Sequence, residues 1–492
     1  MQLNQQSLNQ LPSEIIRPND NVNQAKIGIL HLGLGNFYRA HQCAFTQHCV
    51  AQTGDDWAYV AATMSSPRVI NALKEQDFLY THIAHSSKQT KAEIIHIIKD
   101  AVLVKNEIER FFDYIQDENI VIVSLTITEK GYYYEGATGD LQVDHPDIQA
   151  DLKNDKQPKT AIGALVLGLQ KRKESLGKGL TILSCDNLPN NGEVTQKVIL
   201  QYAAQIDAGL KDWISQNVTF PSSMVDRITP HVTDNDLKWV EETYGYSDAI
   251  PIQTEDFSQW VIEDNFIYGR PKWEIAGAEM VADVSAFEDM KLRLLNGTHS
   301  TMAYLGYLAG FRVIDAVIDN AVFAQFIRDM MDNEITPTLN MPENVDVTAY
   351  KDALIQRYKN PNLKHSTYQI AMDGSQKIPQ RIMNTLKHQY QTQGDYERLI
   401  TALAGWIYYI EATANPNAAY EVQDPMKDEF SRLAGVSGSD AEFVRNILSI
   451  QKIFGDYFTQ HADLMEKITL RHQALKDQGV LTVLQEINIG EN

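Results

Sequence analysis

The chain has 492 residues and a formal net charge of −21 at pH 7, and its composition is 43% hydrophobic and 22% charged. This length predicts two or three domains with large apolar cores, and 16 prolines with 27 glycines disfavour long disorder and fibrous repeats. Because binding to nucleic acid or anionic lipid requires clustered cations, the negative charge predicts neither nucleic-acid nor membrane partners.

The cysteines and the N-terminal segment indicate the compartment. Cys43, Cys49 and Cys185 are too few for a disulfide framework in a chain of this size, and reduced thiols are typical of a cytosol. The N-terminal segment lacks the basic start and apolar stretch of a signal peptide. Apolar runs such as residues 164–169 fall far short of the roughly 20 residues that span a bilayer. We therefore expect a soluble, cytoplasmic protein.

The two halves of the chain differ in the pattern of their apolar residues. Short unbroken apolar runs, typical of strands buried on both faces of a parallel sheet, predict strands at residues 27–32, 57–63, 120–127 and 180–183. After about residue 285 helix-forming stretches follow one another without a strand pattern, at residues 321–331, 395–414, 441–458 and 464–478. We therefore predict an α/β fold with a parallel-sheet domain over residues 1–285 and a mostly α-helical domain over residues 286–492.

The first predicted strand leads into a turn with two glycines, and we expect a helix from there through residue 52. Gly33 can form the tight turn, and Gly35 lets the backbone approach a pyrophosphate that the helix N-terminus attracts. Tyr38 replaces the third glycine of the usual dinucleotide fingerprint. The pattern therefore predicts a dinucleotide site, with a structural turn that binds no ligand as the alternative.

A metal site is a competing interpretation of His41, Cys43, His48 and Cys49 in this helix. The two cysteines are six residues apart, and therefore about 120° apart around a helix axis. They do not converge as the ligands of tetrahedral zinc must. Ordinary packing explains these residues better, and a zinc-dependent alcohol dehydrogenase is disfavoured.

Lys291, Asn296 and His299 share one short segment where the helical half begins. At 100° per residue they lie at about 0°, 140° and 80° around an α-helix, on one broad face. Oxidation of a secondary alcohol without a metal needs a base for the hydroxyl proton and donors for the developing alkoxide. A lysine with a pKa lowered by burial can be the base, while the other two side chains donate hydrogen bonds. A solvated lysine, a capping asparagine and a structural histidine are the alternative.

Further motifs occur in order along nearly the whole chain. They are Gly33-Leu-Gly-Asn-Phe-Tyr-Arg-Ala-His41, Ser124-Leu-Thr-Ile-Thr-Glu-Lys-Gly131, Ser184-Cys-Asp-Asn-Leu-Pro189, Met224-Val-Asp-Arg-Ile-Thr-Pro230, Gln259-Trp-Val-Ile-Glu-Asp264, Lys291-x4-Asn296-x2-His299 and Gln369-Ile-Ala-Met-Asp-Gly-Ser-Gln-Lys377. Together they resemble the polyol-specific long-chain dehydrogenase/reductase family, which includes mannitol 2-dehydrogenase and fructuronate reductase (D-mannonate oxidoreductase). The resemblance implies an N-terminal Rossmann-type domain, a helical C-terminal domain and an active site in the cleft between them.

The resemblance also implies roles for individual residues. Catalysis would need no metal, with Lys291 as the general base and Asn296 and His299 polarising the substrate oxygen. The residues expected to contact the polyol chain are Asn187, Asp226 and Lys377. The residues expected to bind the NAD(P) cofactor at the glycine turn are Gly33, Gly35, Asn36 and Phe37. As alternatives, Asn187 and Asp226 could cap turns, and Lys377 could be a solvated charge.

The implied reaction interconverts a linear polyol or aldonate with its 2-ketose or keto-uronate, such as mannitol with fructose or D-mannonate with D-fructuronate. The segment from Met341 through Lys377 to Arg381 is more similar to the mannonate branch. Against this, Thr254-Glu-Asp256-Phe257 replaces the family's usual Cys-Glu-Pro-Phe, and Asp256 would repel a uronate. An arabitol dehydrogenase and a polyol-phosphate dehydrogenase are alternatives, although no cation cluster for a phosphate is apparent. A non-catalytic nucleotide sensor is a third, but it would not need Lys291.

The residues after the second strand predict that NADP(H) is accepted and preferred. In dinucleotide folds a carboxylate at this place binds the adenosine ribose and repels a 2′-phosphate. No acidic residue occurs between Asp56 and Glu75, and Arg68 stands where relatives often carry an aspartate. An arginine fork suits a phosphate, while an Arg68 that points into solvent is the alternative.

The resemblance, the chain length and the negative charge together bear on assembly. A chain of this size can build both domains by itself. Strong like charge opposes casual self-association. We therefore expect a monomer or, at most, a weak dimer.

Overall fold

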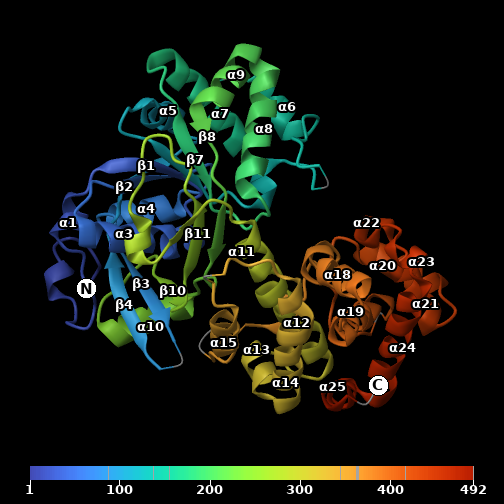
Figure 1. Ribbon diagram of the computed structural model, residues 1–492. Coiled ribbons are helices and arrows are strands. Elements are labelled where there is room, and N and C mark those ends of the chain that lie inside the picture. The colour runs from blue at the N-terminus through green and yellow to red at the C-terminus, as the bar shows by residue number, and fades with distance from the viewer. Residues whose placement is uncertain are drawn as a thin grey trace. The chain divides into compact units, whose positions relative to one another are not determined.

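The computed structural model describes residues 1–490 except 87, 137, 155, 344, 362–364 and 416. The chain divides into two compact units, Met1–Ser285 and Ala286–Asn492. In Figure 1 the first unit runs from blue through green, and the second from yellow to red. Among the described residues no helix is both long enough and apolar enough to cross a membrane.

A six-stranded parallel sheet forms the centre of the first unit, in the order β5-β2-β1-β6-β7-β8. Its strands are β1 (Ile27–Leu32), β2 (Ala58–Thr63), β5 (Ile98–Leu103), β6 (Ile122–Leu125), β7 (Leu180–Ser184) and β8 (Val218–Thr219). The chain extends the sheet from β1 in one direction and then returns to the other side of β1, which is the strand order of a Rossmann fold. The four predicted strands are confirmed as β1, β2, β6 and β7, while β5 and β8 were not predicted.

Helices cover both faces of this sheet (Figure 1). Leu30 and Leu32 of β1 pack with α5 (Ile108–Gln116), α7 (Ala161–Ser175) and α8 (Asn191–Ile206). Ile29 packs on the opposite face with α3 (Gln42–Thr53) and α4 (Arg68–Glu75). Because successive side chains alternate across a strand, only an unbroken apolar run can bury both faces. The remaining helices of this unit are α1 (Asp20–Gln24), α2 (Asn36–Ala40), α6 (Pro146–Lys153), α9 (Ala208–Asn217), α10 (Asp234–Tyr244) and the 3-10 turns η1 (Leu8–Gln10), η2 (Glu129–Tyr132) and η3 (Trp273–Ala276).

Two small mixed sheets, which were not predicted, complete the first unit. The first has the order β10-β3-β4, with β3 (Tyr80–His85), β4 (Thr90–Ile95) and β10 (Ile252–Glu255). The second has the order β12-β11-β9, with β9 (Ser223–Asp226), β11 (Gln259–Glu263) and β12 (Glu279–Val281). The antiparallel pairing of β9 with β11 sets Asp226 opposite Gln259, at the end of β9.

The second unit is helical, and none of its described residues belongs to a sheet strand, as predicted. Its α-helices are α11 (Ser285–Met290), α12 (Thr298–Leu308), α13 (Ile314–Asp319), α14 (Ala321–Asp329), α15 (Val347–Tyr358), α16 (Thr367–Ile370), α17 (Gly374–Ile378), α18 (Asn384–Thr392), α19 (Glu397–Ile410), α20 (Lys427–Val436), α21 (Asp440–Leu448), α22 (Gln451–Phe454), α23 (Tyr457–Gln460), α24 (Ala462–Gln478) and α25 (Val480–Ile489). Two 3-10 turns, η6 (Thr336–Thr338) and η8 (Glu411–Ala414), accompany them. Almost every residue of α19 is buried, and this helix packs against α12 and α24.

Three segments of the second unit are π-helical, namely η4 (Lys291–Gly297), η5 (Met330–Ile335) and η7 (Pro379–Met383). The π-helix is rare, and it is found mostly as short insertions in α-helices, frequently at functional sites. The prediction of regular α-helix around Lys291 is therefore wrong. Two predicted helices are also interrupted: the helix after the glycine turn breaks at His41, and residues 441–458 form α21, α22 and α23.

Candidate functional site

The glycine turn after β1 is built so that only glycine fits at Gly33. Its φ of +117° lies in the region that side-chain-bearing residues avoid, and a Cβ there would lie 2.0 Å from the carbonyl oxygen of Thr126. Gly33 N donates to Ala62 O at the end of β2 (2.9 Å), and Thr126 Oγ1 donates to Gly33 O (2.7 Å). The turn is therefore fixed against the ends of β2 and β6.

The buried His31, which was not predicted as part of the site, forms a hydrogen bond with this turn. His31 donates from Nε2 to Gly33 O (3.0 Å), and its Nδ1 lies 2.9 Å from Ser124 Oγ. Its ring stacks on Tyr38 at 3.5 Å between centroids. Burial lowers the pKa of His31 to about 3, so the ring is neutral and can both donate and accept. The position of His31 inside the apolar run of β1 indicates burial, but its partners on β6 are distant in sequence.

Gly35 precedes α2, which begins with Asn36 and Phe37. Asn36 Oδ1 accepts from the buried Arg39 (2.9 Å), whose other terminal nitrogen donates to Ile250 O (2.6 Å). The Phe37 ring stacks on His41 at 4.9 Å. The helix start is therefore anchored by packing and by Arg39, while its first N–H groups face the turn as helix geometry requires.

Arg68 is exposed at the first position of α4, directly after Pro67. Because β1 and β2 are adjacent parallel strands, the segment from β2 to α4 and the glycine turn lie at the same edge of the sheet. Dinucleotides bind at this carboxyl edge in Rossmann folds. The structure thus places Arg68 on the side of the sheet that carries the glycine turn.

Asn187 and Asp226 also lie in the first unit. Asn187 is exposed in the segment after β7, whereas Asp226 is 5% exposed at the end of β9. The two segments are tied together by Asn191, which donates to Ser223 O (2.7 Å) and accepts from Ser223 N (2.9 Å). The neighbouring Asp186 accepts from three groups, and burial raises its pKa to about 6.

The residues of the competing metal interpretation are buried or have other polar contacts. Burial raises the pKa of the Cys43 thiol to about 12 and also raises that of Cys49. His48 Nε2 lies 2.7 Å from Glu93, which also contacts the buried His82 (2.8 Å). Within the described part of the chain, no group of three or more histidine, cysteine or acidic side chains has a metal-binding arrangement.

In the second unit, the π-helix η4 changes the alignment of the lysine, asparagine and histidine. In the i→i+5 hydrogen-bonding pattern of a π-helix, Asn296 follows Lys291 by slightly more than one turn, so the two residues are nearer to one face than in an α-helix. His299 follows Asn296 by three residues, where side chains on an α-helix are neighbours. Lys291 is 9% exposed, and the other two side chains are half-buried. The π-helical backbone therefore brings the three residues nearer to one face of the segment than the α-helical prediction gave.

His299 is held between aromatic rings. Its ring lies 5.4 Å from Tyr358 in a stacked arrangement and 5.4 Å from His365. Its Nε2 atom is buried and has no hydrogen-bond partner among the described residues. Burial, followed by the charges of His365, Arg381, Arg357 and Lys377, holds its pKa well below the usual 6.5. The imidazole is therefore neutral and presents one polar atom that a ligand oxygen can satisfy.

Lys377 and Arg381 reach the same place from a later part of the chain. Lys377 Nζ donates to Met372 O (2.5 Å) and Ile370 O (3.3 Å), and Arg381 donates to Ser300 Oγ (3.0 Å). The charge of Lys377, a residue predicted for the site, acts on His299. Arg381 was predicted only as the end of the segment that resembles the mannonate branch of the family. No motif in the sequence indicated Tyr358, His365 or Arg357 as site residues.

Both units match known families. Residues 27–275 match the family model described as Mannitol dehydrogenase Rossmann domain, and residues 283–476 match Mannitol dehydrogenase C-terminal domain. D-mannonate oxidoreductase from Escherichia coli (strain K12) is 40% identical over 470 residues, 94% of this chain and 96% of that protein. Mannitol 2-dehydrogenase from Neosartorya fischeri is 36% identical over 467 residues, 93% and 92% of the two chains. The structure of Pseudomonas fluorescens mannitol 2-dehydrogenase in ternary complex with NAD and D-mannitol matches with a TM-score of 0.87 and 33% identity, covering 99% of each chain.

Proposed function

Because the chain belongs to the mannitol dehydrogenase family of oxidoreductases, we propose that it interconverts a secondary alcohol of a linear polyol or aldonate with the corresponding 2-ketose or keto-uronate. The candidate pairs are D-mannonate with D-fructuronate and mannitol with fructose. They are supported by the names of the relatives, a D-mannonate oxidoreductase and mannitol 2-dehydrogenases. NAD(P) carries the hydride, in keeping with the NAD of the matching ternary complex.

The observation that carries this proposal is the placement of buried Lys291 and of Asn296 in η4, directly before His299 of α12, whose buried Nε2 has no partner among the described residues. Lys291, which is 9% exposed, is the general base that takes the hydroxyl proton, since the neutral amine of a lysine can accept one. Asn296 and the neutral His299 donate hydrogen bonds to the substrate oxygen as its charge develops. Catalysis by these three groups needs no metal.

The glycine turn fits a dinucleotide. Gly35 has an extended backbone that any residue adopts, and a Cβ there would meet its nearest neighbour only at 3.8 Å. Neither strain nor packing therefore requires glycine, and its use leaves open space over the turn, as a pyrophosphate needs. Gly33, Gly35, Asn36 and Phe37 would hold the phosphates, and the bound nicotinamide accepts the hydride from the carbinol carbon.

The two units divide these tasks. Residues 1–285 form the dinucleotide-binding domain, and residues 286–492 form the domain with the catalytic residues. Asn187, Asp226 and Lys377 bind hydroxyl groups of the polyol chain, since each buried hydroxyl left unpaired costs about 1–3 kcal/mol. A spectrophotometric panel of mannitol, arabitol, mannonate, fructose and fructuronate, each with both nicotinamide cofactors, tests the proposal. Lack of turnover on every member would contradict it.

We expect the enzyme to prefer NADP(H), with Arg68 as the partner of the 2′-phosphate. The change Arg68→Asp should shift the ratio of kcat/KM toward NAD(H), because a carboxylate repels the phosphate. The matched control is Lys74→Asp, which makes the same charge change on an exposed position later in α4. A strong preference of the wild type for NADH, or an equal shift in both variants, would show that Arg68 does not select the cofactor.

We expect the protein to be a monomer or a weak dimer. Each unit has its own buried apolar residues, and the net charge of −21 opposes self-association. Light scattering over a range of protein concentrations measures the mass directly. A stable tetramer at low concentration would contradict this expectation.

A further inference from the structure

Three basic side chains from separate elements act electrostatically on His299. Arg357 lies in α15, Lys377 in α17 and Arg381 in η7, and the charge of each acts on the imidazole of His299. In a chain with 43 basic and 64 acidic residues, such a group of cations runs against the average composition. We refer to Arg357, Lys377 and Arg381 as the cationic cluster.

Of the cationic cluster, Arg381 is the residue placed to contact a molecule bound beside Lys291, Asn296 and His299. Its backbone packs closely on η4, since a Cβ at Gly297 would lie 2.8 Å from Arg381 O. Its guanidinium donates to Ser300 Oγ at 3.0 Å, so the charged group lies at the turn that carries His299. The side chain is half-buried, whereas Arg357 is 6% exposed and Lys377 is engaged by two backbone carbonyls.

We propose that Arg381 binds the carboxylate of a sugar-acid substrate and thereby makes the enzyme selective for the aldonate and keto-uronate pair over the neutral polyol pair. This inference rests on the proposed function. A guanidinium carries its donors in a planar fork that matches the two oxygens of a carboxylate, which a neutral hydroxymethyl group does not offer. Arg357 and Lys377 add long-range attraction for the same charge.

Asp256, whose charge would repel an acidic substrate, interacts with the cation Arg227, which also interacts with Glu93 and Glu255. Asp256 directly follows β10, where its backbone N–H donates to His85 O (3.1 Å). Its carboxylate interacts with the charge of Arg227, which donates to Ala40 O (2.8 Å). Because opposite charges offset one another, the repulsion that Asp256 exerts on an anionic substrate is reduced.

The test compares D-mannonate with D-mannitol, which differ at one end by a carboxylate and a hydroxymethyl group. We expect wild type to have the higher kcat/KM on mannonate. Arg381→Gln should lower kcat/KM on mannonate by about 10–100-fold, mainly through KM, since the charge-assisted hydrogen bonding to the carboxylate is lost. Its kcat/KM on mannitol should stay within about threefold, and Arg381→Lys should recover part of the mannonate activity. The matched control is Arg432→Gln, at an exposed position in α20.

A second measurement on wild type alone keeps the test independent of how the variants fold. Because salt screens attraction between charges, KM for mannonate should rise with ionic strength while KM for mannitol stays nearly constant. Higher kcat/KM on mannitol, equal losses on both substrates in Arg381→Gln, or a flat salt response with mannonate would overturn the role of Arg381 while leaving the oxidoreductase proposal intact. Failure to turn over either substrate with either cofactor would overturn both.

Discussion

Replacement of Lys291 by alanine should lower kcat by about 10²–10⁴-fold, because that is the usual contribution of a general base. Lys291 is buried at the start of η4, one π-turn before Asn296, so its loss removes the base and leaves the two hydrogen-bond donors in place. Cofactor binding, measured by fluorescence titration with NADPH and NADH, should change little. Steady-state rates of alcohol oxidation on the best substrate of the panel measure the effect.

Two further variants separate loss of the base from loss of packing. Lys291→Arg keeps a long cationic side chain but cannot accept a proton, so it should be nearly as inactive as the alanine variant. Lys452→Ala removes an exposed lysine of α22 and should leave kcat unchanged. Near-normal turnover of Lys291→Ala between pH 6 and 10 would show that another group is the base.

The pH profile adds a second readout of the same role. Oxidation needs a general base in its unprotonated form, so activity should fall on acidification. The pKa of His299 is held well below 6.5 by burial and nearby cations, so this histidine stays neutral near pH 7 and does not cause that loss. Addition of a chelator should leave the rate unchanged, whereas a loss that zinc restores would contradict the proposed mechanism.

The elements that sequence reasoning found are those with a strong local signal. The strands β1, β2, β6 and β7 are buried on both faces, so each shows an unbroken apolar run. The small sheets were missed because short strands such as β4 carry polar residues at exposed positions, and the two-residue β8 is too short for any pattern. Residues 441–458 form three helices instead of one, because α21 ends at Leu448 and Gly455, with φ of +58°, separates α22 from α23.

The residues of the candidate site also fall into those with a local sequence signal and those without one. Motifs located Gly33 and Lys291 because the chemistry needs particular residue types at fixed spacing. The environment of His299 depends on Tyr358, His365 and Arg381, which lie more than fifty residues away in the sequence. The π-helical alignment of η4 could not be read from residue spacing, because the α-helical period was assumed.

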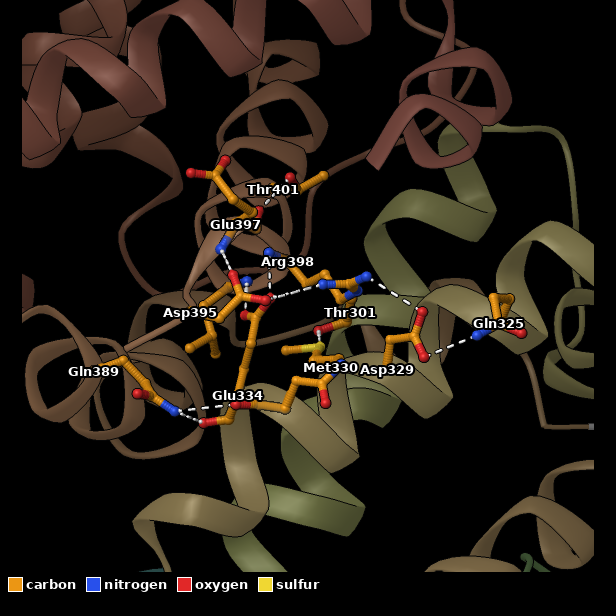
Figure 2. A network of polar contacts seen from close by, with 12 residues as sticks. Thr301, Gln325, Asp329, Met330, Glu334, Gln389, Asp395, Glu397, Arg398 and Thr401 are labelled. Carbon is orange, nitrogen blue, oxygen red and sulfur yellow. Dashed lines mark hydrogen bonds and ion pairs between the residues drawn. The ribbon is translucent and has the colours of Figure 1, made fainter. Parts of the chain in front are cut away.

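A buried carboxylate holds together the start of α19, the central helix of the second unit. Glu334 of η5 is fully buried, and its two oxygens accept from the backbone N–H groups of Arg398 and Leu399, each at 2.8 Å (Figure 2). Those N–H groups belong to the first turn of the helix, where no carbonyl of the helix itself can accept them. The N-cap residue Tyr396 provides no side-chain acceptor there, so a distant glutamate performs this function.

The guanidinium of Arg398 extends the network. It lies 3.4 Å from Glu334 and 3.2 Å from Asp329, so removal of Glu334 also takes one carboxylate from a nearly buried cation. Gln389 donates to the backbone carbonyl of Glu334 at 2.6 Å and fixes η5 in place (Figure 2). Side-chain truncation at Glu334 therefore leaves buried donors without acceptors, which is costlier than replacing the whole network by apolar groups.

Burial raises the pKa of Glu334 to about 8, so its hydrogen bonds count for more than its ion pair. We expect Glu334→Ala to lower the free energy of unfolding by about 2–6 kcal/mol, because two buried backbone N–H groups lose their acceptor at about 1–3 kcal/mol each. Glu334→Gln keeps the shape and one oxygen acceptor but sets an NH₂ group against a backbone N–H, so its loss should be intermediate. The control Glu466→Ala removes an exposed carboxylate of α24 and should change stability by less than about 0.5 kcal/mol. Urea unfolding followed by circular dichroism measures the three variants against wild type. If Glu334→Ala were as stable as Glu466→Ala, water or another group would have to satisfy the start of α19, and the capping role of Glu334 would be wrong.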